Sequence, residues 1–360
     1  HGTVADNTAV LDRRSAKPLV INGNMQVSQR ATSVTGITGN GINTIDRIAL
    51  DLNDNGTWTQ TQSTDVPTGQ GFLSSLKMDC TTADAAVAAG TYHLLRYKFE
   101  GQDCQLFKKG TSSAEYITVA FWIKSNKTGT FTVELFDSEG DDRTISKTFT
   151  IDSGDTWEKK VLSFIGDTSS AQPNTNALGL SVNIWMTGGS TFTGGTLQTA
   201  WGAKTDNERA DTSVNIADST DNEYYLTGLQ VEVGEFDANS IAPFQHESYG
   251  DNLARCQRYF QIFTQPPLIG SANANNTIAR ASIGLFPVQM RAAPTAVQSG
   301  TLSWFYSNSH QPTSTAFSAS YTDVDGAEFD VTVSGTGMTA THPCSVFQSG
   351  SAFISFAAEL

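Results

Sequence analysis

The chain of 360 residues is longer than one typical domain and predicts two domains with a short tail. A hydrophobic fraction of 38%, an aromatic fraction of 10% and a charged fraction of 16% are typical of a folded, β-rich protein rather than a disordered one. The net charge of −14 argues against a nucleic-acid partner, because phosphate binding needs clustered cations. The densest basic clusters are the pairs Lys108-Lys109 and Lys159-Lys160, which we interpret as solvated strand ends. The sequence has no run of 18 apolar residues, so we expect no membrane insertion.

Residues 1–17 carry mixed charge without periodicity, and we expect an N-terminal arm that becomes ordered against a partner. From there, alternation of apolar and polar residues predicts strands through most of the chain. The clearest strand covers residues 116–124, where four alternate positions from Ile117 to Ile123 are apolar. The turn residues 125–129 follow it and predict a hairpin with the next strand. We expect a meander that continues through residues 131–135, 145–151, 157–164 and 178–186 and closes at 225–233.

Short strands separated by polar turns predict an all-β fold, with a jelly-roll β-sandwich over residues 18–247. Helical periodicity is scarce outside residues 251–263, which lie inside a connector at residues 248–266. Asp251 or Asn252 is the predicted N-cap of this helix. Pro266-Pro267 ends the connector, and residues 267–360 predict a second, smaller β-sandwich with alternating segments at 278–286, 327–333 and 353–356.

Three blocks of sequence carry a resemblance to known proteins. The first is NGNMQVSQR at residues 22–30, after the apolar residues 19–21 and with Asp46-Arg47 further on. The second and most specific block is LTGLQVEVG at residues 226–234, which runs on through residues 242–260. The third is FPVQMRAAPT at residues 286–295 with the terminal residues 358–360. In these blocks the chain resembles tail-fibre and related virion-appendage proteins of bacteriophages, especially marine ones, although Ile48 stands where those proteins tend to carry an aromatic residue.

The resemblance implies a jelly roll similar to carbohydrate-binding modules, opened by a strand at residues 22–30, joined by a short helical segment to a small C-terminal β domain, and assembled as a homotrimer. It brings no catalytic motif. We therefore expect a structural protein of the virion that contacts other virion proteins and binds a host-surface glycan through multivalent, individually weak sites. One alternative is a purely structural appendage, decoration or filament subunit without glycan binding. A more remote alternative is a polysaccharide depolymerase.

The predicted connector helix carries an apolar stripe formed by Leu253, Cys256 and Phe260, which are spaced by three and four residues. Such a stripe needs a partner surface. We predict that these residues lie at the oligomer interface, near a threefold axis.

Sugar rings stack on flat aromatic side chains that have planar polar groups beside them. Trp58, Trp185 and Trp201 are the candidate glycan-binding residues: two lie in polar sequence rich in Thr and Gly, and Trp185 is opposite the apolar face of its strand. The alternative for each is a place in the core or in the trimer interface. Trp122 and Trp157 are expected in core or sheet packing.

Residues 51–56, DLNDNG, fit the first half of a calcium-binding loop with Asp51, Asn53 and Asn55 as ligands. The second half is missing, because Gln62 stands where a bidentate glutamate is needed. A structural calcium ion at these three residues is one hypothesis, and a plain turn at Asn55-Gly56 is the alternative.

The sequence contains no G-x-S-x-G, H-E-x-x-H or P-loop motif, and no pair of carboxylates stands out among 36 acidic residues as a glycosidase pair. We therefore expect no enzyme activity. His93 and His246 are expected to be hydrogen-bonded structural residues. The four cysteines are too sparse for a disulfide scaffold or a zinc module, so buried free thiols are the default expectation and a Cys80–Cys104 disulfide is the alternative.

Overall fold

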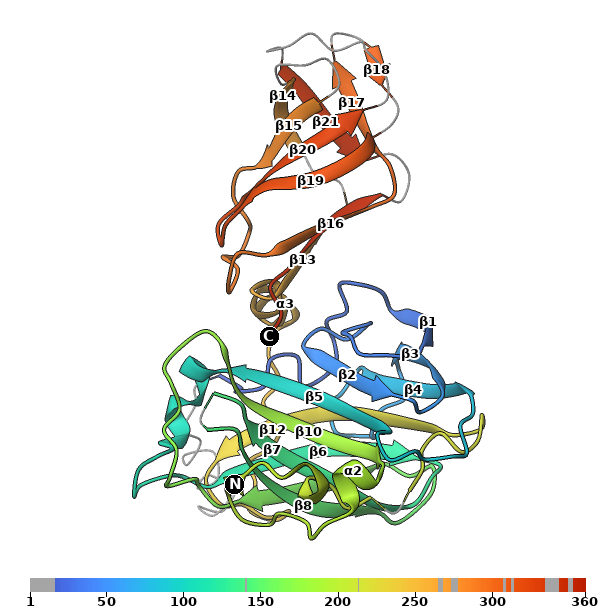
Figure 1. The fold of residues 1–360 in the computed structure, drawn as a ribbon, viewed down its shortest axis with the longest axis vertical. Helices are drawn as coiled ribbons and strands as arrows, with labels where there is room; N and C mark the ends of the chain where they lie inside the picture. The colour runs from blue at the N-terminus through green and yellow to red at the C-terminus, as the bar shows by residue number, and fades with distance from the viewer. Residues whose placement is uncertain are drawn as a thin grey trace. The chain divides into compact units, whose positions relative to one another are not determined.

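The computed structural model describes residues 17–360 except residues 140, 213, 265–267, 273–277, 307–308, 312–313, 334–342 and 349–351. Residues 1–16 of the predicted arm therefore lie outside the described residues. The fold is all-β, as the sequence predicts, with few short helices (Figure 1). The chain divides into two compact units, residues 1–252 with Leu360 and residues 253–359. No helix among the described residues is long and apolar enough to cross a membrane.

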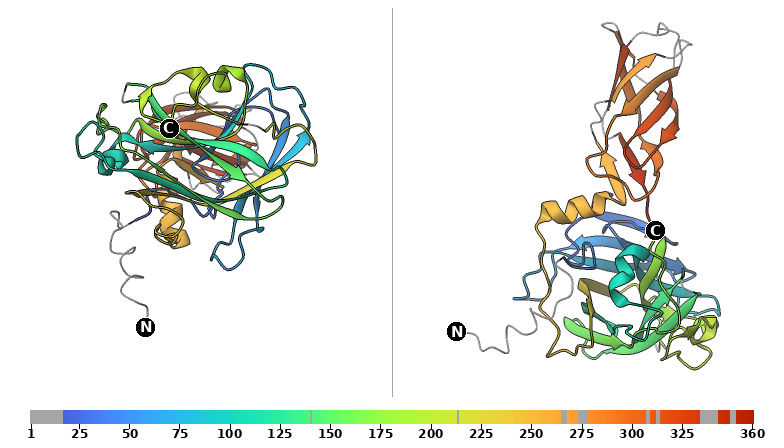
Figure 2. Two further views of the ribbon diagram at one scale, coloured as in Figure 1. Left: turned by 90° about the horizontal axis from the view of Figure 1, so that it is seen from below. Right: turned by 90° about the vertical axis from the view of Figure 1, so that its left-hand side faces the viewer.

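The N-terminal unit is a sandwich of two six-stranded sheets, and Figure 2 shows its two layers from below. The first sheet has the strand order β1 (Ser33–Ile37), β3 (Thr57–Ser63), β4 (Ser75–Thr82), β12 (Glu223–Val233), β6 (Ile117–Ser125) and β9 (Glu158–Phe164). The second sheet has the order β11 (Gly202–Ala203), β8 (Arg143–Ile151), β7 (Gly129–Asp137), β10 (Leu178–Gly188), β5 (Tyr92–Glu100) and β2 (Ile48–Asn53). All strand pairs that the structure describes here are antiparallel.

One core lies between the two sheets, because each strand turns its apolar face inward. Ile117, Val119, Phe121 and Ile123 of β6 are all buried, as the alternation predicts. Phe121 meets Phe149 of the opposite sheet edge to face, with ring centroids 5.3 Å apart. Burying apolar side chains contributes about 25 cal/mol per Å² of apolar area, so this core is the main source of stability of the unit.

The predicted meander is wrong at its first turn. β6 and β7 belong to different sheets, so the turn at residues 125–129 connects one sheet to the other instead of closing a hairpin. β7 and β8 do pair directly, whereas β9 pairs with β6 and β10 with β7 and β5. The physical reason is that strands on either side of a core both show period-two alternation, which does not identify their neighbours.

The C-terminal unit contains a three-stranded and a seven-stranded sheet. The smaller sheet has the order β13 (Phe260–Phe263), β22 (Phe353–Ala357) and β16 (Thr295–Ser299). The larger sheet has the order β18 (Ser309–Gln311), β17 (Leu302–Tyr306), β21 (Pro343–Gln348), β14 (Leu268–Ala272), β15 (Ile278–Ile283), β20 (Ala327–Val333) and β19 (Ser314–Thr322). Three of these strands, β15, β20 and β22, match the alternating segments that the sequence predicts.

The connector helix is shorter than predicted. Helix α3 covers Tyr249–Gln257, and Phe260 begins strand β13. Its first turn is closed by Ser248, whose hydroxyl accepts from the Asp251 amide at 3.2 Å and donates to the Asp251 carboxylate at 2.6 Å. The predicted N-caps are therefore wrong: Asp251 is the partner of the cap, and Asn252 lies within the helix. The chain leaves the helix because residues 260–263 pair with β22.

The block at residues 22–30 is not a strand, in contrast to the implication of the resemblance, because β1 begins at Ser33. Asn22 instead holds a tight turn, because its side-chain amide nitrogen donates to the backbone carbonyls of Val27 and Asp46. The side-chain oxygen of Asn252 accepts from the backbone N–H of Asn22 at 2.9 Å, and its side-chain nitrogen donates to the side-chain oxygen of Asn24 at 3.1 Å. Side-chain amides can replace strand pairing as the partners of buried backbone groups, and here they tie the first block to the second.

Candidate functional site

Trp58 is fully buried, so the prediction that it forms an exposed platform is wrong. Its indole nitrogen donates to the Asn55 carbonyl at 2.7 Å, and its ring meets His93 edge to face at 4.7 Å. His93 bonds the Tyr224 hydroxyl at 2.7 Å and the Asn55 side chain at 3.3 Å, which confirms its structural role. Complete burial lowers the pKa of His93 to about 3 because the charged imidazolium would lose its hydration.

Trp185 lies on the outer face of the second sheet, opposite Ile184 and Met186 as predicted, but it is 1% exposed. Helix α2 (Ser190–Thr193) covers it, with the rings of Phe192 and Trp185 5.2 Å apart. The Arg209 guanidinium lies 5.1 Å from the Trp185 ring centre. Trp185 therefore has no free ring face for a sugar, and the prediction of a glycan platform here is wrong.

The Trp185 indole is one donor to a buried carboxylate, Glu134 of β7. Arg209 binds both carboxylate oxygens, at 2.7 and 3.0 Å, and Asn183 and Thr144 donate at 2.9 Å each. Burial by itself raises the pKa of Glu134, but Arg209 and the neutral donors together lower it below its ordinary value. Glu134 thus stays charged and fixes the segment that carries Arg209 to the sheet.

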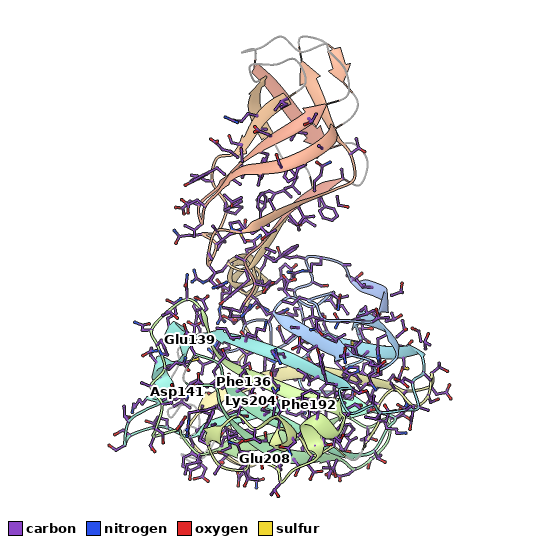
Figure 3. The ribbon with its side chains drawn as sticks, viewed as in Figure 1. Phe136, Glu139, Asp141, Phe192, Lys204 and Glu208 are labelled. Carbon is purple, nitrogen blue, oxygen red and sulfur yellow. The ribbon has the colours of Figure 1, made fainter. Side chains whose placement is uncertain are left out.

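Phe136 lies beside this network on the same outer face and is half-buried (Figure 3). The Lys204 ammonium and the Arg209 guanidinium lie 5.7 and 5.4 Å from its ring centre. Two cations thus lie against this ring.

Trp201 is half-buried and covers a second buried charge network. Its indole nitrogen donates to the Ile165 carbonyl at 2.6 Å, and the Lys109 ammonium lies 4.9 Å from its ring centre. Lys109 is itself buried and pairs with Asp137, with Asp167 3.7 Å away. One ring face of Trp201 is therefore engaged inside the protein.

The predicted calcium ligands already have protein partners. Asp51 pairs with Arg96 at 2.7 Å, Asn53 donates to the Gly90 carbonyl at 3.1 Å, and Asn55 is buried beside His93. Within the ranges that the structure describes, no three His, Cys, Asp or Glu side chains gather as metal ligands. The calcium hypothesis stays untested.

The predicted interface stripe is split between two elements. Cys256 is on α3 and Phe260 is on β13, and both are buried within one chain, whereas Leu253 is half-buried. Cys256 and Phe260 therefore need no second chain to cover them, and the interface prediction depends on Leu253. Cys80 and Cys104 are buried free thiols, as expected, so the alternative of a Cys80–Cys104 disulfide is wrong.

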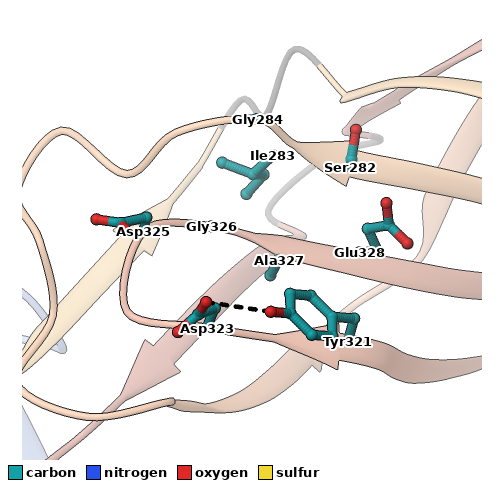
Figure 4. Close-up of a pocket in the computed structure, with 9 residues that line it drawn as sticks. All are labelled: Ser282, Ile283, Gly284, Tyr321, Asp323, Asp325, Gly326, Ala327 and Glu328. Atoms are coloured by element: carbon teal, nitrogen blue, oxygen red, sulfur yellow. Dashed lines mark hydrogen bonds between the residues drawn. The ribbon is translucent and has the colours of Figure 1, made fainter.

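A pocket of about 280 Å³ lies in the C-terminal unit beside Tyr321, Asp323, Asp325 and Glu328 (Figure 4). Its acidic groups are partly engaged, because Asp323 accepts from the Tyr321 hydroxyl at 3.1 Å and Asp325 from the Gln289 amide at 3.0 Å. An acidic pocket with one tyrosine shows no arrangement of groups specific for a ligand.

Aromatic and lysine side chains gather instead on the outer face of the first sheet. We call this the aromatic–lysine surface, and it consists of Lys77, Trp122, Lys124, Trp157, Lys159 and Tyr225. The register explains how it forms, because Lys77, Tyr225 and Lys124 are directly opposite one another across β4, β12 and β6, and Trp122 is opposite Lys159. All are half-buried except Tyr225, which is 6% exposed. Trp122 and Trp157 are therefore packed on the sheet face and not in the core, which is one of the two places expected for them.

Asp65 organises one side of the aromatic–lysine surface. It accepts from the Trp157 indole at 2.9 Å and pairs with Lys124. The Lys124 ammonium lies 4.2 Å from the Tyr225 ring centre and 5.9 Å from that of Trp157. Burial raises the pKa of Asp65, but the hydrogen bonds from Lys124 and Trp157 lower it more strongly in sum. Trp157 is thus held at a fixed angle on the face.

Gly228 allows Trp122 to lie close to the sheet. It has φ +64° and lies at an irregularity of the β12–β6 pairing between Thr227 and Gln230. A Cβ at this position would come within 2.6 Å of Phe72 and 3.1 Å of Trp122. The neighbouring Leu73 is 69% exposed. Glycine is required at position 228 for two reasons: the backbone is left-handed, and the rings of Phe72 and Trp122 lie close to its Cα.

Comparison with known proteins gives no family for the chain. No family model and no curated protein matches it. The chain is similar in structure to the enzymatically active domain of tailspike protein 4 of bacteriophage CBA120, with TM-score 0.31, 14% identity, and coverage of 60% of this chain and 21% of that chain. A putative sugar-binding protein of Bacteroides thetaiotaomicron gives TM-score 0.32, 9% identity, and coverage of 60% and 100%. A family 11 carbohydrate-binding module from Clostridium thermocellum was solved in complex with a β-1,3-1,4-mixed-linked tetrasaccharide. It gives TM-score 0.26, 10% identity, and coverage of 59% of this chain and 98% of that chain.

The chain thus spans about a fifth of the length of the tailspike domain, and the two binding proteins are matched over nearly their whole length. All three TM-scores are below 0.5, so these likenesses carry no argument about function. The candidate site rests on the residues of this chain.

Proposed function

We propose that the N-terminal unit binds a glycan on the aromatic–lysine surface. The observation that carries this proposal is that Trp122 and Trp157 are both half-buried on the outer face of the first sheet rather than in the core. Trp157 precedes β9 by one residue, so in the continued β6–β9 register it is diagonal to Trp122. Side chains at such diagonal positions are about 7–8 Å apart, which suits adjacent contacts along one ligand.

The chemistry of the surface suits sugar rings. Pyranose rings place C–H groups against aromatic faces and hydroxyl groups toward planar or charged side chains. Asp65 and Lys124 provide such groups beside Trp157. On the outer face of the second sheet, by contrast, Trp185 is covered by Phe192 and has no free ring face.

We further propose that the protein is a non-enzymatic structural component of a bacteriophage virion appendage, assembled as a homotrimer that contacts other virion proteins and attaches the particle to host-surface glycan. The support for this part is the sequence resemblance at residues 22–30, 226–260 and 286–295. Three weak sites held in one trimer would bind a glycan-coated surface with useful avidity, although each site alone binds weakly.

A glycan array probed with the intact protein tests the binding function. We expect signals for a group of related glycans. The absence of any signal from an intact oligomer would contradict glycan binding. It would favour the alternative of a purely structural appendage subunit. Release of shorter oligosaccharides from a bound polysaccharide would instead support the depolymerase.

A further inference from the structure

Lys159 and Lys160 are adjacent on β9 but differ in their partners. The Lys160 ammonium lies 2.5 Å from Glu158 and 3.4 Å from Asp152. Glu158 also accepts from the backbone amides of Asp152 and Ser153, at 2.9 and 2.8 Å. The carboxylates of Glu158 and Asp152 are therefore held by Lys160 and by the backbone of the turn before β9.

Lys159 has no such counter-ion. In the part of the chain that the structure describes, its ammonium makes no ion pair or hydrogen bond, although its side chain is half-buried. The other two lysines of the aromatic–lysine surface each have an acidic partner, Glu223 for Lys77 and Asp65 for Lys124. Burial lowers the pKa of Lys159, since partial loss of water disfavours the charged form and nothing offsets it.

The position of Lys159 places this cation among the aromatic side chains. Lys159 is directly opposite Trp122 in the register and two residues after Trp157, which precedes β9 by one residue. A partly desolvated lysine without a counter-ion gains a charge-assisted contact when a ligand supplies the opposite charge.

We propose that the ligand of the aromatic–lysine surface is an acidic glycan, whose carboxylate or sulfate group pairs with Lys159 while its sugar rings lie against Trp122 and Trp157. This inference rests on the proposed glycan-binding function. A lysine ammonium is a compact point charge without the planar fork of arginine, so it can pair with either anion.

Because the chain as a whole is negatively charged, only a cation close to the ligand can attract an acidic glycan. The chain has net charge −14, so it does not attract polyanions in general. At physiological ionic strength, charges more than about 8 Å away are largely screened, which leaves the nearest cation to decide the interaction. An acidic glycan that binds this protein must therefore contact a particular cation rather than a general positive field.

Affinity electrophoresis of the full chain tests the inference with two matched pairs of polymers. Polygalacturonate and its methyl-esterified form differ in the carboxylate, and dextran sulfate and dextran differ in the sulfate. We expect the protein to bind at least one acidic polymer and to bind its neutral counterpart about tenfold less well, the effect of one charge-assisted contact. Lys159→Gln should lose this preference, and the matched control Lys160→Gln should keep it. Thermal melts of both variants check that each is folded.

The outcomes separate the two proposals. Equal binding of the acidic and neutral members of both pairs, or an unchanged preference in Lys159→Gln, overturns the acidic ligand while glycan binding stands. If the full chain binds none of the four polymers and no glycan on the array, glycan binding itself is wrong. Preference within the first pair alone identifies a carboxylate, and preference within the second alone identifies a sulfate.

Discussion

Trp122 on β6 lies directly opposite Lys159 on β9, on the outer face of the first sheet. Directly opposite side chains in an antiparallel pair have Cβ atoms about 4.5–5.5 Å apart, so the ring and the cation can contact the same ligand. The inward-facing neighbours, Phe121 and Ile123, are buried in the core. The same alternation that builds the sandwich therefore also exposes the candidate binding groups.

Asp65 acts as a positioning residue for Trp157, because it accepts the indole hydrogen bond and pairs with Lys124. We expect Asp65→Ala to weaken glycan binding about three- to tenfold, the effect of about 1 kcal/mol from one lost hydrogen bond, with a small change in stability. Asp65→Glu should recover part of the affinity. Asp152→Asn, which alters an exposed ion pair outside the surface, is the control for affinity measured by titration. Equal affinity of the alanine variant and the parent would show that Trp157 needs no fixed orientation.

The buried pair of Glu134 and Arg209 should be sensitive to the loss of either partner. Glu134→Gln removes the charge and leaves the guanidinium half-paired, so we expect a loss of about 3–5 kcal/mol in the free energy of unfolding. Arg209→Met should cost a similar amount because it leaves the carboxylate charged and buried. The double variant should lose less than the sum of the two. Urea unfolding curves measure all three, and strict additivity would contradict a direct interaction.

His93 predicts a specific dependence of stability on pH. Its pKa is about 3 in the folded chain, against an ordinary value of 6.5, so the unfolded chain binds the extra proton first as the pH falls. The stability that His93 contributes is complete above pH 6.5 and is lost between pH 6.5 and about 3, by about 1.4 kcal/mol per pH unit. The variant His93→Gln should show a shallower decline over this range. Equal slopes for the His93 variant and the parent would refute the assignment.

Leu253 is the residue on which the predicted oligomer interface depends. We expect Leu253→Asp to shift the proposed homotrimer toward monomers in light scattering, because a charge in an apolar contact loses hydration without a partner. Leu285→Asp, at a side chain 79% exposed in the C-terminal unit, serves as the control. An unchanged oligomer in the Leu253 variant would place the interface elsewhere.

The sequence predicts most strands of this fold but not their partners. The segments at residues 116–124 and 327–333 match β6 and β20 closely, because alternation follows directly from burial of one face. Pairing depends on contacts between distant residues, such as β12 with β6, and nothing local encodes it. The helix boundary was missed because the contact of residues 260–263 with β22 overrides their helical spacing.

The tryptophans illustrate the same limit. Trp122 alternates with the apolar residues of its strand, so its outward direction could have been read from the sequence. The burial of Trp58 and Trp185 could not be predicted in this way. Trp58 packs against Tyr224, which is distant in the sequence, and Trp185 packs against Phe192, which follows it after a turn. Polar sequence around a tryptophan is therefore a weak indicator of an exposed ring.

The most direct test of the glycan-binding surface is a glycan array that compares the parent protein with the double variant Trp122→Ala and Trp157→Ala. Tyr321→Ala, at an exposed aromatic ring of the C-terminal unit, is the control for loss of an aromatic side chain. Each stacked ring contributes about 1 kcal/mol, so two lost rings should reduce each signal by about tenfold or more, while the control binds like the parent. Array signals that persist in a folded double variant would show that the glycan binds elsewhere.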